Sequence, residues 1–195
     1  STAHRIAPGW TYGFPELIAG QAEAIAKARR VANPGCYATG AIALLRPLVE
    51  AGLIAPTSPL TLNAVSGYSG GGKSMIEAYE AGTAAPFELY ALGLEHKHIP
   101  EIQAYSKLET RILFVPSVGN FRQGMIVSIP LQLASLPGHP SAADLQEALA
   151  KHYQASEFVS VVAPEADGKL DAQALNDTNR LDLRVVSNVA HGHAP

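Results

Sequence analysis

The sequence is poor in cysteine, in charge and in uninterrupted apolar runs: it has one cysteine among 195 residues, and charged residues make up 16% of it. One cysteine cannot form an intrachain disulfide, so nothing indicates an oxidising compartment, and we expect a cytoplasmic protein. The longest apolar segment, at 38–54, is interrupted by Arg46, Pro47 and Glu50, which excludes a membrane span. The sequence also does not open with a charged-then-apolar export signal.

The balance of charges argues against a nucleic-acid partner. The formal net charge is -3, whereas a protein that follows a nucleic-acid backbone needs clustered Lys and Arg. Any anion is therefore expected to be bound locally. Hydrophobic residues make up 47% of the chain, which is enough for one ordinary core, and we find no internal repeat. We expect a single domain over residues 1–195.

Apolar spacing and helix-ending residues predict several helices. They cover 15–30, 37–51, about 74–81, a segment entered from the loop at 95–108, and 141–154 with Ser141 as its N-cap. Pro34 disfavours helical geometry at Asn33, so the second helix follows a break in the chain, NPGC. This break is where we expect chemistry.

The pattern changes to β-rich runs in the second half of the chain. The segments 110–118 and 124–133 are joined by the short link GNFRQ, which predicts an antiparallel pair. A further strand is predicted before them at 58–65, and others after them at 158–164 and 181–188. Helices mixed with mostly antiparallel strands predict an α+β fold with a mixed sheet.

Cys36 stands at the N-terminus of the helix predicted from 37, where unpaired backbone N–H groups and the helix dipole favour a thiolate. Gly35 lets a substrate approach closely, and the small Ala38, Thr39 and Gly40 are expected to leave open space on the first turn. A lone intracellular cysteine is more often an inert buried residue. The neighbours favour a nucleophile instead.

A thiolate nucleophile needs a partner for proton transfer, and His96 and His98 in LEHKHIPEI are the candidates. An imidazole titrates near neutrality and suits acid–base work, although either residue could be an ordinary surface histidine. The H-x-H spacing also permits a metal ligand pair. No third and fourth ligands stand at a recognisable spacing, and HGHAP at 191–195 looks frayed, so we expect no metal.

The segment VSGYSGGGKS at 65–74 matches the phosphate-loop spacing through Gly67, Gly72, Lys73 and Ser74. A nucleotide-hydrolysing loop needs a later apolar strand that ends in Asp, and the later strands do not supply one. We therefore interpret the segment as an anion-binding concavity of glycine N–H groups with Lys73 beside it. A flexible turn is the alternative, although four glycines in six residues exceed what a turn needs.

Four motifs in order, NPGCYATG, VSGYSGGGKS, GLEHKHIPEI and FVPSVGNFRQGM, together with the opening STAHR, closely resemble the N-acetyl-gamma-glutamyl-phosphate reductase family, in particular its shorter branch. The resemblance extends from Ser1 to about Leu133 and is weaker through LNDTNRLDL. The family belongs to the semialdehyde dehydrogenase superfamily, whose members join a dinucleotide-binding domain to an α+β catalytic and dimerisation domain. This chain is similar to the second of these.

The resemblance implies a mechanism and its residues. Cys36 attacks the acyl phosphate of N-acetylglutamyl phosphate, and NADPH reduces the resulting thioester to the semialdehyde, a step of arginine biosynthesis. His96 is implied as the proton-transfer residue, with His98 in reserve. Substrate binding is implied for Arg5, Lys73, Arg122 and His98. The approach of the NADP cofactor is implied to be lined by Ser69, Gly70 and Gly72.

The sequence departs from the family at both ends. No G-x-G-x-x-G fingerprint follows a strand near the start, so the NADP-binding domain expected upstream is absent, and we expect no NADPH-dependent turnover by this chain alone. The final SNVAHGHAP lacks the glycine-rich segment and helix that return to the cofactor domain, so the end is truncated or divergent. The paired sheet predicts a homodimer or homotetramer.

Rival interpretations stay open at this point. A P-loop-like protein would bind a nucleotide through Lys73, and a purely structural assembly domain would bury Cys36. Within the enzyme class, an aspartate-semialdehyde or aminoadipyl-phosphate reductase would use the same thiol chemistry, and the residues do not reveal the length of the acyl chain.

Overall fold

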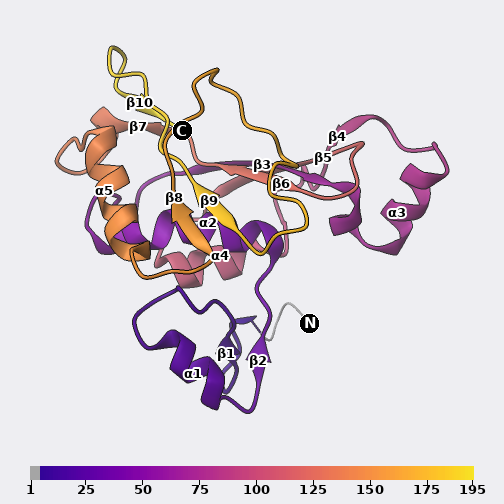
Figure 1. Ribbon diagram of the computed structural model, residues 1–195, viewed down its shortest axis with the longest axis horizontal. Coiled ribbons are helices and arrows are strands. Elements are labelled where there is room, and N and C mark those ends of the chain that lie inside the picture. Colours follow the sequence, from indigo (N-terminus) through magenta and orange to yellow (C-terminus); the bar gives the residue numbers. More distant parts are fainter. Residues whose placement is uncertain (1–4) are drawn as a thin grey trace.

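The computed structural model describes residues 5–195, so Ser1 to His4 of the opening motif lie outside the described residues. Along the chain the elements are β1 (Thr11–Tyr12), α1 (Gln21–Lys27), β2 (Val31–Ala32), α2 (Cys36–Glu50), β3 (Thr61–Gly67), the 3-10 turn η2 (Tyr68–Gly71), α3 (Lys73–Glu80), β4 (Phe87–Leu89), α4 (Ile99–Ser106), β5 (Leu113–Gly119), β6 (Met125–Ser128), β7 (Leu131–Gln132), the 3-10 turn η3 (Leu133–Ser135), α5 (Ala142–Tyr153), β8 (Val159–Val161), β9 (Leu181–Leu183) and β10 (His193–Ala194). Helices and a mixed sheet confirm the α+β class (Figure 1).

The main sheet has the strand order β4-β5-β3-β6, with β3 parallel to β5 and the other two pairings antiparallel. The predicted antiparallel pairing of 110–118 with 124–133 is wrong, because β3 lies between β5 and β6. The link between them crosses the end of β3, where Gly67 N–H donates to Gly124 O at 3.0 Å. A Cβ at Gly67 would lie 2.6 Å from the backbone of Arg122, so only glycine admits this crossing.

Helix α2 lies under one face of this sheet, beside α4 and α5 (Figure 1). Ile42 and Leu45 are fully buried, as the helical spacing predicts. Ala38 is fully buried too, and a Cβ at Gly40 would lie 3.0 Å from Val127 Cγ2. The small residues of the first turns therefore allow close packing of α2 on its neighbours. The open space expected at Ala38 is filled by protein, whereas Gly40 lines a cavity together with Cys36.

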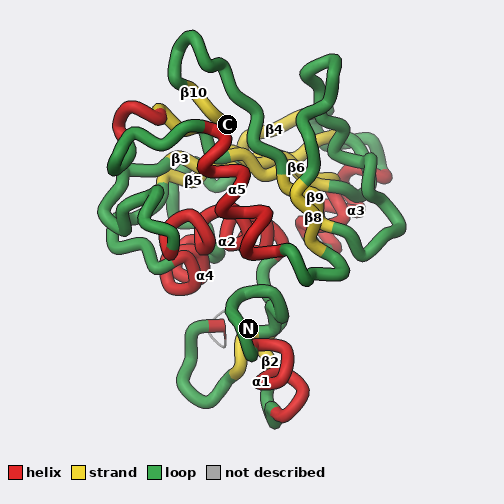
Figure 2. The backbone as a smooth tube through the Cα atoms, turned by 60° about the vertical axis from the view of Figure 1, so that its left-hand side comes forward, coloured by secondary structure: helices red, strands yellow, loops and turns green. Residues whose placement is uncertain are grey.

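The N-terminal part forms a small lobe of β1, β2 and α1 that projects from the body beyond α2 and α4 (Figures 1 and 2). The helix predicted over 15–30 is shorter, because Gly20 adopts φ of 80° and the chain turns extended at Ala28. None of the residues of α1 is buried. The helix is held at its start by Gln21, whose side-chain amide donates to the Tyr12 carbonyl at 2.6 Å.

The C-terminal part adds small sheets to the body. Strands β8 and β9 pair in parallel, and β10 pairs with β7, so the terminal HGHAP forms backbone pairing at His193. Ser141 caps α5 as predicted, in a reciprocal capping box with Asp144. Within residues 5–195 no helix is long and apolar enough to cross a membrane.

Candidate active site

Cys36 is the first residue of α2, and it is exposed. The first intrahelical hydrogen bond runs from Thr39 N to Gly35 O at 2.8 Å. The backbone N–H groups of residues 36–38 therefore have no acceptor within the helix. The position predicted for Cys36 at a helix N-terminus is confirmed. A negative charge that develops on the thiol or beside it would face the positive end of the α2 dipole.

The residue before the cysteine is anchored by a buried carboxylate that the sequence did not indicate. Gly35 N–H donates to Glu101 Oε1 at 2.8 Å, and Tyr12 Oη–H donates to the same oxygen at 2.8 Å. Arg5 Nη1 donates to Glu101 Oε2 at 3.0 Å, and Glu101 is 2% exposed. Both carboxylate oxygens are thus occupied, which is what burial of a charge requires.

His98 packs directly on Gly35: a Cβ added at Gly35 would lie 2.4 Å from His98 Nε2. The imidazole is 4% exposed, and its Nδ1 has no hydrogen-bond partner within residues 5–195. Burial lowers the pKa of His98 to about 3, and the neighbouring charges of His96, Arg5 and Lys97 act in the same direction. His98 is therefore neutral near pH 7.

His96 is half-buried and is held by the backbone of its neighbour. The N–H of His98 donates to His96 Nδ1 at 3.1 Å, so a neutral His96 carries its proton on Nε2. Its ring stands edge-on to Phe114 with 4.9 Å between ring centroids. Burial lowers the pKa of His96, and the charge of Lys97 adds to this. His96 is thus the more accessible of the two predicted proton-transfer residues.

Two tyrosines complete the surroundings of the cysteine. Tyr37 Oη lies 2.9 Å from the Ser117 carbonyl oxygen and 2.8 Å from Ser66 Oγ. Tyr90 Oη–H donates to Tyr37 Oη at 3.2 Å. Burial raises the pKa of Tyr37 and of Tyr90, and the nearby charge of Cys36 contributes in both cases, so the hydroxyls stay protonated. They tie the start of α2 to β3 and β5.

A cavity of about 500 Å³ opens beside Cys36. Among the residues predicted to face the cofactor, Ser69 and Gly70 line it together with the cysteine, whereas Gly72 does not. The N–H groups of Tyr68 and Ser69 donate to the carbonyls of Phe121 and Arg122 at 2.9 and 3.0 Å. These two N–H groups are therefore not available to an anion.

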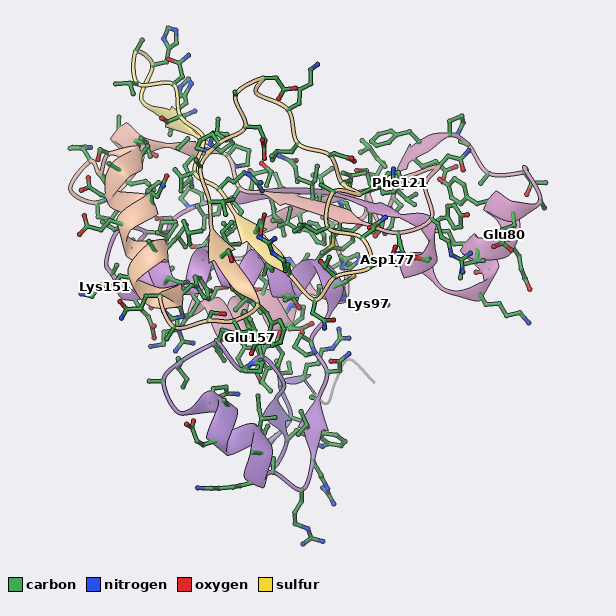
Figure 3. All side chains as sticks on the ribbon, viewed as in Figure 1. Glu80, Lys97, Phe121, Lys151, Glu157 and Asp177 are labelled. Carbon is green, nitrogen blue, oxygen red and sulfur yellow. The ribbon has the colours of Figure 1, made fainter. Side chains whose placement is uncertain are left out.

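The three predicted anion-binding cations have different surroundings. Arg5 is near the cysteine, but its Nε donates to Asn33 O at 2.9 Å and its Nη1 to Glu101, so it supports the loop before Cys36. Lys73 is 90% exposed and lies 3.6 Å from Glu77. Arg122 is 65% exposed and donates to Glu80 on α3. Glu80 lies well apart from Lys97, the residue between His96 and His98 (Figure 3). Neither Lys73 nor Arg122 lines the cavity at Cys36.

Sequence reasoning missed Glu101, Tyr37 and Tyr90. Glu101 is in the first turn of α4, where an acidic residue ordinarily faces solvent and complements the helix dipole. Its burial depends on Arg5 and Tyr12, which are far away in sequence. The described residues contain no group of three or more His, Cys, Asp or Glu side chains arranged to hold a metal ion.

Comparison with known proteins extends the picture. Residues 36–194 match the family model of the semialdehyde dehydrogenase dimerisation domain. N-acetyl-gamma-glutamyl-phosphate reductase 2 of Pseudomonas putida is 52% identical over 98% of this chain, which covers 63% of that protein. N-acetyl-gamma-glutamyl-phosphate reductase of a Chelativorans species is 51% identical over 100% of the chain and 65% of that protein. The chain thus spans less than two thirds of the length of these curated relatives.

Solved structures agree in fold. Aspartate semialdehyde dehydrogenase of Francisella tularensis superposes with a TM-score of 0.68 at 11% identity, over 100% of this chain and 66% of that one. Aspartate semialdehyde dehydrogenase II of Vibrio cholerae gives a TM-score of 0.67 at 14% identity, over 97% of this chain and 62% of that one.

Proposed function

The chain belongs to the semialdehyde dehydrogenase dimerisation-domain family, and on that premise we propose that it is the catalytic part of an N-acetyl-gamma-glutamyl-phosphate reductase. The observation that carries the proposal is an exposed cysteine on the first turn of a buried helix, with His98 packed on the preceding Gly35 and bonded to His96. The relatives that have this name are about 50% identical to the chain over nearly its whole length. The relatives are longer than this chain, so the complete reductase activity is proposed for the longer enzyme of which this chain would be a part.

The first step is acyl transfer to the thiol. The Cys36 thiolate attacks the acyl carbon of N-acetylglutamyl phosphate, a carbon–sulfur bond forms, and phosphate leaves with the electrons of the broken carbon–oxygen bond. The N–H groups at the start of α2 are placed to stabilise the oxyanion that forms during the attack. We assign the proton transfers of the second step to His96: once hydride has added to the thioester carbon, His96 Nε2–H would protonate the alkoxide oxygen of the hemithioacetal. The same nitrogen would take that proton back when the carbon–sulfur bond breaks, the aldehyde forms and the Cys36 thiolate leaves.

NADPH supplies the hydride when it is bound, and Ser69 and Gly70 are the residues of this chain that would face it. Both line the cavity that Cys36 also lines, and a Cβ at Gly70 would meet nothing closer than Ser66 Oγ at 3.8 Å. We propose that the dinucleotide-binding domain belongs to a part of the enzyme outside these 195 residues. The chain alone is then expected to stop at the thioester.

We also propose that copies of the chain associate through the face of the main sheet opposite α2. The strand register places the side chains of Phe87, Leu89, Leu113, Val65 and Ile126 on this face. Phe87, Leu89 and Leu113 are 58%, 52% and 45% exposed, which is unusual for neighbouring large apolar residues. A homodimer or homotetramer would cover them. Sedimentation of the chain and of Leu113→Glu tests this, because the charge should shift the chain towards monomer.

The proposed chemistry is tested by incubating the chain with N-acetylglutamyl phosphate and measuring its intact mass and the phosphate released. The expected result is one acyl group on Cys36, removable by hydroxylamine, with an equal amount of phosphate. The variant Cys36→Ala should gain no acyl group. A wild-type chain that is folded, has a titratable thiol and remains unacylated would overturn the proposal, as would acylation that persists in Cys36→Ala.

A further inference from the structure

Glu101 is a buried, fully paired carboxylate that the proposed chemistry does not use. Its three hydrogen-bond donors come from three separate segments: Arg5 near the start, Tyr12 on β1, and Gly35 before α2. Burying a charge is costly unless hydrogen bonds satisfy it, and an apolar residue would fill the same volume without that cost. The arrangement therefore calls for an explanation beyond stability.

The bond to Gly35 determines how the backbone enters α2. Gly35 N–H is held by Glu101 at 2.8 Å, and Gly35 C=O is held by Thr39 N at 2.8 Å and by Thr39 Oγ1 at 3.0 Å. The peptide that joins Gly35 to Cys36 is planar and trans, so its N–H points opposite to its C=O. With the carbonyl directed into the helix, the N–H of Cys36 is directed out of the N-terminal end of α2.

A histidine at the start of α4 also packs against Gly35. His98 is the N-cap of α4 and Glu101 lies three residues later in its first turn, so both are at the start of the same helix. A Cβ on Gly35 would lie 2.4 Å from His98 Nε2 and 2.7 Å from Arg5 Nη1. His98 N–H in turn holds His96 Nδ1. Helix α4 therefore fixes the nucleophile's backbone and the proton-transfer histidine in one frame.

We propose that Glu101 is a positioning residue for acyl transfer. It anchors the Gly35 N–H, and through it the outward-facing N–H of Cys36 and the distance between Cys36 and the pair of His96 and His98. This inference rests on the proposed function. Glu101 touches neither the substrate nor the thiol, so its loss affects the step that needs aligned oxyanion donors more than it affects simple reactivity of the sulfur.

The experiment compares two reactions of the same cysteine in the full chain. Acylation by N-acetylglutamyl phosphate needs the backbone donors, whereas alkylation by iodoacetamide needs only an accessible thiolate. The test variant is Glu101→Asp, whose shorter side chain keeps the charge for Arg5 but does not reach Gly35. Glu101→Gln can place its amide oxygen at the Oε1 position, where both Gly35 and Tyr12 donate, and loses only the bond from Arg5. We expect the ratio of acylation rate to alkylation rate to fall about tenfold or more in Glu101→Asp, since a misplacement of about 1 Å can cost about a hundredfold.

Three further variants make the result interpretable. Glu147→Gln changes an exposed glutamate on α5 and should leave the ratio unchanged. Tyr12→Phe removes one donor to Glu101 and keeps the Gly35 bond, so its ratio of acylation rate to alkylation rate should stay close to that of the wild type. Glu101→Gln, which can keep the Gly35 bond, should show a smaller fall than Glu101→Asp. Amide exchange at Gly35 should accelerate in Glu101→Asp.

Each outcome has a separate meaning. A folded Glu101→Asp variant that keeps the wild-type ratio within about twofold would overturn the positioning role while leaving the acyl-transfer function intact. A wild-type chain that is not acylated would overturn the proposed function. In that case unchanged Gly35 amide exchange in Glu101→Asp would overturn the anchoring contact as well, and accelerated exchange would support it.

Discussion

Helices α2 and α3 both begin directly after glycine, and both were expected to face an anion, yet their surroundings differ sharply. Most residues of α2 are buried, and Gly35 before it is bonded to the buried Glu101. In α3 only Tyr79 is buried, Gly72 before it adopts φ of 86°, and Lys73 is 90% exposed. A helix N-terminus is common to both. The support from α4 belongs to one.

The two helices differ in what surrounds the N–H groups at their starts. The dipole and the unpaired N–H groups are present at every helix N-terminus. At α2 they are fixed in direction by a second helix and lie beside a histidine pair, whereas at α3 they face solvent. The glycines before α3 serve another purpose, because Gly67 lets the link at 120–124 cross the end of β3.

The largest difference is expected from matched truncations in the two helices. Ile42 of α2 is fully buried, so Ile42→Ala should lower the free energy of unfolding by about 2–5 kcal/mol. Ile76 of α3 is half-buried, and Ile76→Ala should cost clearly less. Urea unfolding of both variants measures this. Equal losses would mean that α3 is as much part of the core as α2.

A methyl group at Gly35 should be the next most damaging change. Gly35 has φ of -72°, so alanine is allowed by the backbone, but its Cβ would lie 2.4 Å from His98 Nε2. The overpacking should cost about 1–3 kcal/mol and slow the acylation of Cys36. Gly40→Ala, where Val127 lies 3.0 Å from the added Cβ, is a milder control. Wild-type stability in Gly35→Ala would show that His98 can move away.

The α2 site should also be sensitive to acid. The folded pKa of His98 is about 3, below the ordinary value of 6.5, so the unfolded chain takes up a proton first as the pH falls. The stability of the folded state with a neutral, buried His98 is fully present above pH 6.5, and part of it is lost as the pH falls from 6.5 to about 3. Urea midpoints across this range should fall less steeply in His98→Asn than in the wild type. Parallel curves would contradict the prediction.

The smallest effect is expected at the surface of α3. Lys73 and Glu77 are 90% and 64% exposed and 3.6 Å apart, so Lys73→Ala should lower stability by no more than about 0.5 kcal/mol. The difference should shrink in high salt because the charges are screened. Thermal unfolding at two salt concentrations measures it. A loss above 1 kcal/mol at both would place Lys73 in an interaction other than this ion pair.

Local signals in the sequence predicted some features correctly for stated reasons. Pro34 and Gly35 break the chain before an apolar helix, and this placed Cys36 at the start of α2. Ser141 followed by Asp144 produced a capped helix. The prediction of an antiparallel pair from 110–118 and 124–133 was wrong, because a short link predicts neighbours only when no third strand is inserted between the two.

By itself the sequence determined the α+β class, the family, the exposed cysteine on a helix N-terminus and the histidine pair, because each depends on residues that are close together in the chain. Only the tertiary structure decided that Glu101 is buried and bonded to Gly35, that His98 is a packed neutral imidazole, and that neither Lys73 nor Arg122 lines the cavity at Cys36. These outcomes depend on contacts between distant segments. Burial and desolvation set the charge of a side chain there, and sequence spacing does not encode them.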